Sequence, residues 1–330
     1  MTKRLLIALA LILTLTAPAA TFAATKKKAP PAPKKPSWGL TWNVCRTYAV
    51  TKANTKARKY PTISQTVTAI QGAKAAAATL SLCAGNYAED VVLDGATNFR
   101  FLGHGGTTTN VRGAGVNEAV FHLLGSGSLD FENLNISAAA SSTGETLTAV
   151  WAENPEAKAS TVSLVSANIE GFPQALHLKG NANLTLDKSA VSHNPGGVED
   201  ITIDVEGSSC AHPATVSLNA TEIASNTGAQ TWHLVNVNFN SNDSSMGRNV
   251  DQGFLNGSCH RLTAFGSTFY LNQATIAPLF VGDASSTLLM RATGVLRNVD
   301  TAGDDFAQGY AKVTIDPSCN VSQNSVPGSN

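Results

Sequence analysis

Four charged side chains of this chain could form a site for acid–base chemistry. Arg100 and Asp130 share one position of a repeated sequence pattern, and Glu132 and Asp187 share another. Two carboxyl groups roughly 6.5–9.5 Å apart can act as acid and base in the inverting hydrolysis of a glycosidic bond. An arginine beside them can hold an anionic group. The alternative is a solvated sheet face with ordinary charges, on which Arg100 and Asp130 form a cross-strand pair.

The elements that would position these residues follow from the repeat. Each copy has an apolar residue, any residue, an apolar one, two of any kind, a small or hydroxyl residue, any residue and an apolar one. The copies begin at Leu129, Val162, Leu184, Val216, Leu262, Leu288 and Val313. The alternation predicts a short strand with one buried face, followed by a corner, a second short strand, a turn and a third strand. Such a repeat indicates stacked units that bury their apolar faces against each other. The longest step, between Val216 and Leu262, contains the polar segment 238–258, which we interpret as a large loop.

Asparagines recur ten residues after the first apolar position of several copies. They are Asn194, Asn226, Asn272 and Asn298. Stacked at one corner, their amide side chains would hydrogen-bond from coil to coil, as in other stacked β-assemblies. Ordinary turn chemistry is the alternative.

With this repeat, the chain resembles the right-handed parallel β-helix superfamily that includes pectate lyases and pectin methylesterases. The start of the domain carries a second similarity, because residues 61–65, an Ala-rich segment and residues 80–93 match that superfamily's opening. There, a "Thr-Ile-x-x-Ala" helix precedes a strand and a "Gly-x-Tyr-x-Glu" turn, and residues 99–105 are similar to the "Leu-x-Gly-x-Gly" coil that follows. The resemblance covers roughly residues 60–324.

The resemblance implies an all-β fold: a right-handed parallel β-helix solenoid of about eight coils with an N-terminal α-helical cap. We expect this domain to span residues 38–330, with the cap helix near 62–78. Thr62 and Gln65 form a capping box at its start, and Ile63, Val67 and Ile70 fall on one helical face.

In this superfamily polysaccharides lie across the outer face of the first-strand sheet. Arg100, Asp130 and Glu132 would meet on that face, with Asp187 two strand spacings, or roughly 9–10 Å, from Glu132. The resemblance therefore makes Glu132 and Asp187 the candidate acid and base, with Arg100 and Asp130 shaping the adjacent binding subsite. The chain lacks the paired Asp of polygalacturonases, the Asp, Gln and Arg strands of pectin methylesterases and the Asp cluster of calcium-dependent lyases. These departures put catalysis in doubt.

Other catalytic groups are dispersed in the sequence. His104, His177, His193 and His233 have no evident Ser or Cys nucleophile as a partner. We predict neither a cofactor nor a bound metal.

The five cysteines suit an oxidising compartment. We expect disulfides between Cys45 and Cys83, on either side of the cap helix, and between Cys210 and Cys259, each just before a first strand. Cys319 would remain free and buried. A rival hypothesis is a zinc site formed by Cys210, His212, Cys259 and His260, although its spacing matches no established zinc pattern.

The N-terminus predicts export. Residues 1–23 have a basic start, an apolar core and a stretch of small residues, as in a cleaved signal peptide, and the apolar run is short for a membrane span. Residues 24–37 form a Lys/Pro-rich linker. We therefore expect a secreted, periplasmic or cell-surface protein without stable membrane insertion; an uncleaved signal that anchors the chain is the alternative.

The charge distribution disfavours one class of partner. Seven of the 23 basic residues and none of the 23 acidic residues lie before residue 37, which leaves 16 basic and 23 acidic residues in the body. An acidic body without a basic stripe disfavours nucleic acid. Two hypotheses remain: recognition of a polysaccharide or cell-envelope partner without catalysis, or a polysaccharide lyase or glycoside hydrolase that acts on an acidic glycan.

Overall fold

The computed structural model describes residues 38–105, 108–138, 148–155, 158–196, 201–274, 279–300, 307–322 and 324. The signal peptide and the linker lie outside these residues and stay predictions. The described residues belong to one compact unit, Ser37–Asn330. No helix among them is long and apolar enough to cross a membrane.

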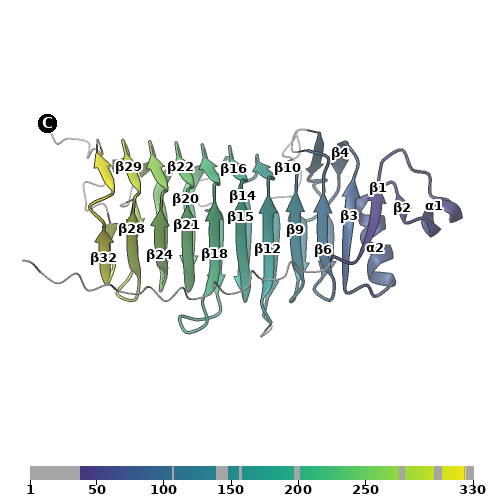
Figure 1. The fold of residues 1–330 in the computed structure, drawn as a ribbon, viewed down its shortest axis with the longest axis horizontal. Coiled ribbons are helices and arrows are strands. Elements are labelled where there is room, and N and C mark those ends of the chain that lie inside the picture. Colours follow the sequence, from purple (N-terminus) through teal and green to yellow (C-terminus); the bar gives the residue numbers. More distant parts are fainter. Residues whose placement is uncertain are drawn as a thin grey trace, which may run out of the picture. The chain divides into compact units, whose positions relative to one another are not determined.

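Three parallel sheets make up this unit, and the chain visits them in turn, so that each strand pairs with the equivalent strand of the next coil (Figure 1). Sheet A contains β2 (Lys59–Tyr60), β1 (Leu40–Val44), β3 (Ala77–Leu82), β6 (Asn98–Leu102), β9 (Ser128–Glu132), β12 (Ser160–Val165), β15 (Ala182–Asp187), β18 (Ala214–Asn219), β21 (Val237–Asn242), β24 (Arg261–Phe265), β28 (Thr287–Arg291) and β32 (Lys312–Ile315). Sheet B contains β4 (Gly85–Ala88), β7 (Thr109–Arg112), β10 (Asn135–Ser137), β13 (Asn168–Glu170), β16 (Ala190–Ser192), β19 (Glu222–Ala224), β22 (Ser245–Gly247), β25 (Thr268–Tyr270), β29 (Gly294–Leu296) and β33 (Asn320–Ser322). Sheet C contains β5 (Val91–Asp94), β8 (Ala119–Leu124), β11 (Thr148–Asn154), β14 (Gln174–Gly180), β17 (Ile201–Gly207), β20 (Thr227–Val235), β23 (Val250–Ser258), β26 (Gln273–Ala274) and β30 (Val299–Asp300), with β27 (Phe280–Val281) and β31 (Ala307–Gln308) joined through β23. This arrangement confirms the predicted parallel β-helix.

The predicted inward column of sheet A is confirmed by the strand register. Leu129, Val162, Leu184, Val216, Leu262 and Leu288 lie in one line and are at most 1% exposed. Together with apolar residues from sheets B and C they form one continuous core. The hydrophobic effect therefore acts on every coil through the same alternating positions.

The predicted large loop between Val216 and Leu262 is wrong. Residues 237–258 form a complete further coil, β21 to β23, and Phe239 pairs with Val216 on one side and Leu262 on the other. The apolar pattern does not reveal this coil because Ser241, a polar residue, occupies the second inward position of the repeat in β21. Ser241 is buried there and its hydroxyl is 2.8 Å from that of Ser267, which satisfies it in the core.

The corners between sheets A and B depend on the left-handed backbone region. One residue with positive φ follows the sheet A strand in successive coils: Ser166, Lys188, Ala220 and Asp243, with φ between 46° and 50°. Gly266, with φ of 60°, takes the same place in the next coil. Ladder hydrogen bonds on both sides hold these strained turns, as in the bond from the Lys188 amide to the Asn219 carbonyl.

The asparagine ladder is present at the corner after sheet B. Its side chains form an unbroken chain of amide hydrogen bonds of 2.9–3.1 Å through Asn194, Asn226, Asn249, Asn272, Asn298 and Asn324. Asn249 belongs to the coil that the sequence pattern missed. Each of these amides also donates to a backbone carbonyl, as Asn249 does to that of Ile223, so buried amides are tolerated at this corner.

At the N-terminal end, two short helices precede the first complete coil. They are α1 (Lys52–Lys56) and α2 (Ile63–Gly72). Helix α2 is shorter than predicted, and β3 begins at Ala77; its buried face joins the core, and it contacts β1, β3 and β5. The Glu89 carboxylate accepts bonds from the amides of Ile63 (2.9 Å) and Ser64 (2.8 Å), which suits the positive N-terminal end of a helix. The closing role of α2 as a cap stays a prediction.

The cysteines pair as predicted. Disulfides join Cys45 to Cys83 and Cys210 to Cys259, with Cα–Cα distances of 5.1 and 5.7 Å. Cys319 is free as predicted, but it is only partly buried, so its predicted burial is wrong. The rival zinc hypothesis is wrong, since two of its ligands are oxidised. The third, His260, is buried, and its Nε2 lies 2.8 Å from the Tyr310 hydroxyl.

Candidate functional site

The predicted residues on sheet A do meet. Arg100, Asp130 and Glu132 lie on the outward face of β6 and β9, and the Arg100 guanidinium binds both carboxylates. Nη2 donates to Glu132 Oε2, and Nε lies 3.4 Å from Asp130 Oδ2. In this cluster one guanidinium is shared by two carboxylates, the opposite of the apolar surroundings that keep a general acid protonated.

Asp187 stands apart from this cluster. It lies in the same column as Glu132 but two strands away, with Val165 between them. Its Oδ1 accepts a 2.6 Å bond from Asn219, which in turn accepts one of 3.3 Å from Asn242. Asp187 therefore begins an amide row along the outer surface, and the proposed acid–base pairing with Glu132 remains a prediction.

The outer face of sheet C carries a second and more unusual arrangement. Five side chains from consecutive strands stand in one column, which we call the sheet C row: His122, Trp151, His177, Asp204 and His233. The rings are in contact, with centroid distances of 5.5 Å between His122 and Trp151 and 4.7 Å between Trp151 and His177. The parallel register, with strands about 4.8 Å apart, spaces these groups evenly along the solenoid.

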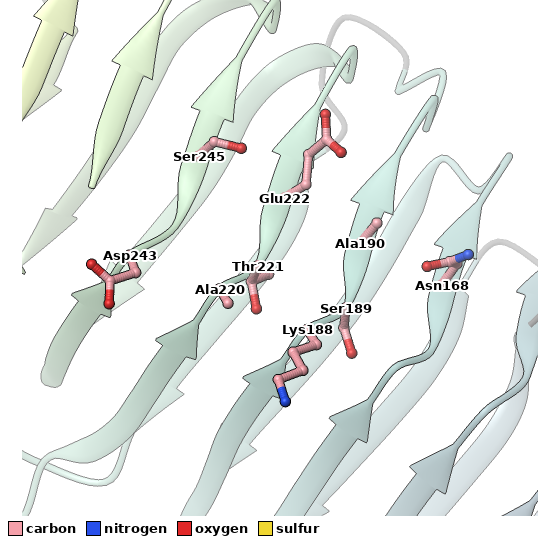
Figure 2. A pocket seen from close by; sticks show the side chains of 9 residues that line it. All are labelled: Asn168, Lys188, Ser189, Ala190, Ala220, Thr221, Glu222, Asp243 and Ser245. Atoms are coloured by element: carbon pink, nitrogen blue, oxygen red, sulfur yellow. The ribbon is translucent and has the colours of Figure 1, made fainter. Parts of the chain in front are cut away.

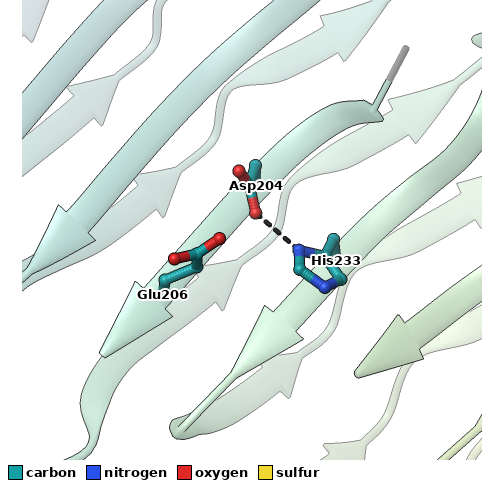
Figure 3. Close-up of side chains that lie close together, drawn as sticks. All are labelled: Asp204, Glu206 and His233. Atoms are coloured by element: carbon teal, nitrogen blue, oxygen red, sulfur yellow. Dashed lines mark hydrogen bonds and ion pairs between the residues drawn. The ribbon is translucent and has the colours of Figure 1, made fainter. Parts of the chain in front are cut away.

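Asp204 lies between two imidazoles. Its Oδ2 is 3.0 Å from His177 Nδ1. Its Oδ1 is 2.7 Å from His233 Nδ1 (Figure 3). Burial opposes ionisation of Asp204, but the hydrogen bonds from His177 and His233 outweigh it and lower the carboxyl pKa to about 2. The bond to Asp204 raises the pKa of His233 despite its burial. Because a carboxylate only accepts hydrogen bonds, His233 presents an N–H at Nδ1, and its Nε2 is left for another partner.

The sheet C row has buried ring nitrogens at one end and solvent-exposed side chains at the other. Among the described residues, buried nitrogens without a hydrogen-bond partner occur at Nε2 of His122, Nε1 of Trp151 and Nε2 of His177. Such groups are costly in a folded protein and often mark a functional site. On the open side, the side chains of His233, Glu206 and Lys179 are 26%, 37% and 44% exposed. A ligand could reach these three groups directly.

A shallow hollow of about 390 Å³ lies elsewhere, along the corner between sheets A and B (Figure 2). Its lining consists of Asn168, Lys188, Ser189, Ala190, Ala220, Thr221, Glu222, Asp243 and Ser245. This lining offers hydrogen bonds but no aromatic side chain. We therefore regard it as a weaker candidate than the sheet C row.

The sequence reasoning missed the sheet C row. His177 and His233 lie far apart in the sequence, and Asp204 is not among the predicted site residues. The signal was present in the third strands, where FHLLG, VWAEN, LHLKG, IDVEG and WHLVN align without gaps. Their second position holds the five residues of the row.

Comparisons with known proteins find similarity only at the level of structure. No model of a known protein family matches the sequence, and no curated protein matches it. Among solved structures, pectin methylesterase from carrot shows 13% identity and a TM-score of 0.41, with 84% of this chain and 89% of that chain covered. Deglycosylated pectin methylesterase from Aspergillus niger shows 11% identity and a TM-score of 0.48, with 84% and 90% covered. The A-module of a mannuronan C-5 epimerase from Azotobacter vinelandii shows 12% identity and a TM-score of 0.22, with 81% and 95% covered. These scores transfer no residue roles. The strand pairing and the coil repeat themselves show a parallel β-helix fold, without a specific enzyme family.

Proposed function

We propose that this chain is an exported β-helix protein that binds a polysaccharide along the outer face of sheet C. The observation that carries the proposal is the sheet C row, a linear array of ring and carboxylate side chains spaced one strand apart. A linear polymer can follow such an array, with the half-buried Trp151 ring as apolar contact and Lys179, Glu206 and His233 as polar contacts. The two disulfides support an oxidising compartment outside the cytosol.

A glycan array followed by affinity measurement tests the proposal. We expect Trp151→Ala to weaken binding of the best-scoring polysaccharide by roughly tenfold or more, since a buried aromatic contact contributes on the order of 1–2 kcal/mol or above. Phe265→Ala is the matched control, because Phe265 is 53% exposed on the outer face of sheet A. Equal binding by Trp151→Ala, with loss in Phe265→Ala, would move the binding face to sheet A.

A second candidate function is catalysis on an acidic glycan, and one observation favours it. Asp204 holds His233 by Nδ1 at 2.7 Å and leaves its other nitrogen toward the open side, the arrangement of an oriented general base. Glu132 and Asp187 on sheet A are the alternative acid and base predicted from the sequence, but Arg100 already binds Glu132.

Release of reducing ends from pectin, alginate and peptidoglycan separates the two functions. Recognition without catalysis predicts binding with no new ends. Product that disappears in His233→Gln would place catalysis on sheet C. Product that disappears in Glu132→Gln and Asp187→Asn would place it on sheet A.

A further inference from the structure

Three side chains with metal-binding atoms converge at the open end of the sheet C row. Asp204 and Glu206 are two residues apart on β17 and so face outward together, and His233 stands opposite Asp204 on β20 (Figure 3). One ligand atom from each lies within 4.8 Å of the others. Ligand atoms this close together can contact a single ion after small side-chain shifts.

We propose that Asp204, Glu206 and His233 bind a divalent transition-metal ion of the zinc class. One imidazole nitrogen and two carboxylate oxygens are a donor set that suits zinc and its neighbours in the first transition row. Calcium would require six to eight oxygen ligands, which these three residues do not supply. Three protein ligands leave an open position for water or a ligand from solvent.

His177 completes the site from behind. It binds the second oxygen of Asp204 at 3.0 Å, and both side chains are nearly buried, at 9% and 7% exposed. Carboxylate ligands of metal sites are commonly oriented by such an outer hydrogen bond. The buried pair fixes one ligand, whereas the exposure of Glu206 and His233, at 37% and 26%, leaves a path for the ion.

Two features oppose metal binding and sharpen the test. The Lys179 ammonium lies 3.9 Å from Glu206 Oε1, so a cation must displace it or share the carboxylate with it. The ion must also take the place of the proton between His233 and Asp204. Removal of the Lys179 charge should therefore raise metal affinity, an effect that damage to the fold cannot imitate.

The metal proposal does not depend on polysaccharide binding. Metal binding is measured on the full chain without any glycan, so either proposal can fail while the other stands.

The experiment is a titration of the metal-stripped full chain with Zn²⁺ against a chromophoric chelator, and with Co²⁺ by visible absorption. All proteins carry Cys319→Ser, because Cys319 is a free thiol that could bind zinc. We expect one ion per chain, with affinity lowered roughly tenfold or more by His233→Gln and by Glu206→Gln. We expect Lys179→Gln to bind more tightly. His193→Gln is the matched control, since His193 is exposed on another face, and should bind as the parent does.

Several results would overturn the proposal. They are no Zn²⁺ binding by the parent, equal affinity of His233→Gln, Glu206→Gln and His193→Gln, or unchanged or weaker binding by Lys179→Gln. Calcium binding that equals or exceeds zinc binding would contradict the proposed class of ion. Thermal melts of each variant show whether a lost affinity reflects unfolding.

Discussion

Asp204 and His233 stand directly opposite each other on neighbouring parallel strands, with Asp204 Oδ1 2.7 Å from His233 Nδ1. The pair is oriented from the far side by His177 and is open to solvent at His233. On sheet A, by contrast, Arg100 is already engaged in ion pairs with both Asp130 and Glu132. The side chains that are both held in place and open to a ligand therefore lie on sheet C.

The asparagine ladder should contribute strongly to stability. Asn249 makes four side-chain hydrogen bonds of 2.9–3.2 Å, to Asn226, Asn272 and the Ile223 carbonyl. Asn249→Ala leaves buried partners unsatisfied, and we expect it to lower the free energy of unfolding by at least about 2 kcal/mol. Urea unfolding measures the loss. The exposed Asn168, changed to Ala, should stay within about 0.5 kcal/mol of the parent; equal losses in both variants would refute a special role for the ladder.

A buried carboxyl group should make stability depend on pH. Burial raises the pKa of Asp251 to about 7, from the ordinary value of 3.8 for an aspartate. The Thr231 hydroxyl donates a hydrogen bond to the Asp251 carboxyl group. The folded state thus holds the proton more tightly than the unfolded state, so this contribution is complete below pH 4 and is lost as pH rises to 7 and above. We expect Asp251→Asn to remove a fall of about 3–4 kcal/mol across this range.

Comparison of the Asp251→Asn variant with the parent separates the contribution of Asp251 to pH-dependent stability from that of His260. Burial lowers the pKa of His260 to about 4, from 6.5, so its contribution is lost in the opposite direction, as pH falls from 6.5 to 4. Unfolding free energies at several pH values give both slopes. The exposed Asp94, changed to Asn, serves as control. A profile for Asp251→Asn parallel to that of the parent would show that Asp251 titrates normally.

The core column predicts a gradient of mutational cost along the solenoid. Leu288 and Val313 are register neighbours on β28 and β32, but Leu288 is 1% exposed and Val313 is 43% exposed. Leu288→Ala should cost about 2–5 kcal/mol through lost burial and a cavity, whereas Val313→Ala should cost less than about 1 kcal/mol. Equal costs in chemical denaturation would mean that the last strand is covered in solution.

The fold was predictable from the sequence because sheet A repeats its inward positions with little variation. The alternation predicts a strand with one buried face in each coil, as at Leu184 and Leu186 or at Val216 and Leu218. The prediction failed at Ser241, where a hydroxyl in the core interrupts the apolar alternation and is satisfied by a neighbour from the next coil. A pattern of apolar residues cannot show a hydrogen bond between coils.

The candidate site was less predictable because its members are far apart in the sequence and the spacing between them varies. Asp204 lies 29 residues before His233, but the loops between sheets B and C differ in length from coil to coil, so a fixed period does not align the third strands. The pairing of Arg100 with Asp130 was predictable because both residues lie in the regular first strand of their coils. The sheet C row emerges only when each third strand is placed in register with the next.

Hydroxyl-radical footprinting with the best-scoring polysaccharide tests the central claim most directly. Mass spectrometry compares the oxidation rates of Trp151 and His233 on sheet C with that of Phe265 on sheet A, with and without the polysaccharide. Binding along the outer face of sheet C predicts several-fold slower oxidation of the sheet C residues and an unchanged rate at Phe265. Protection of Phe265 with unchanged rates at Trp151 and His233 would contradict the account.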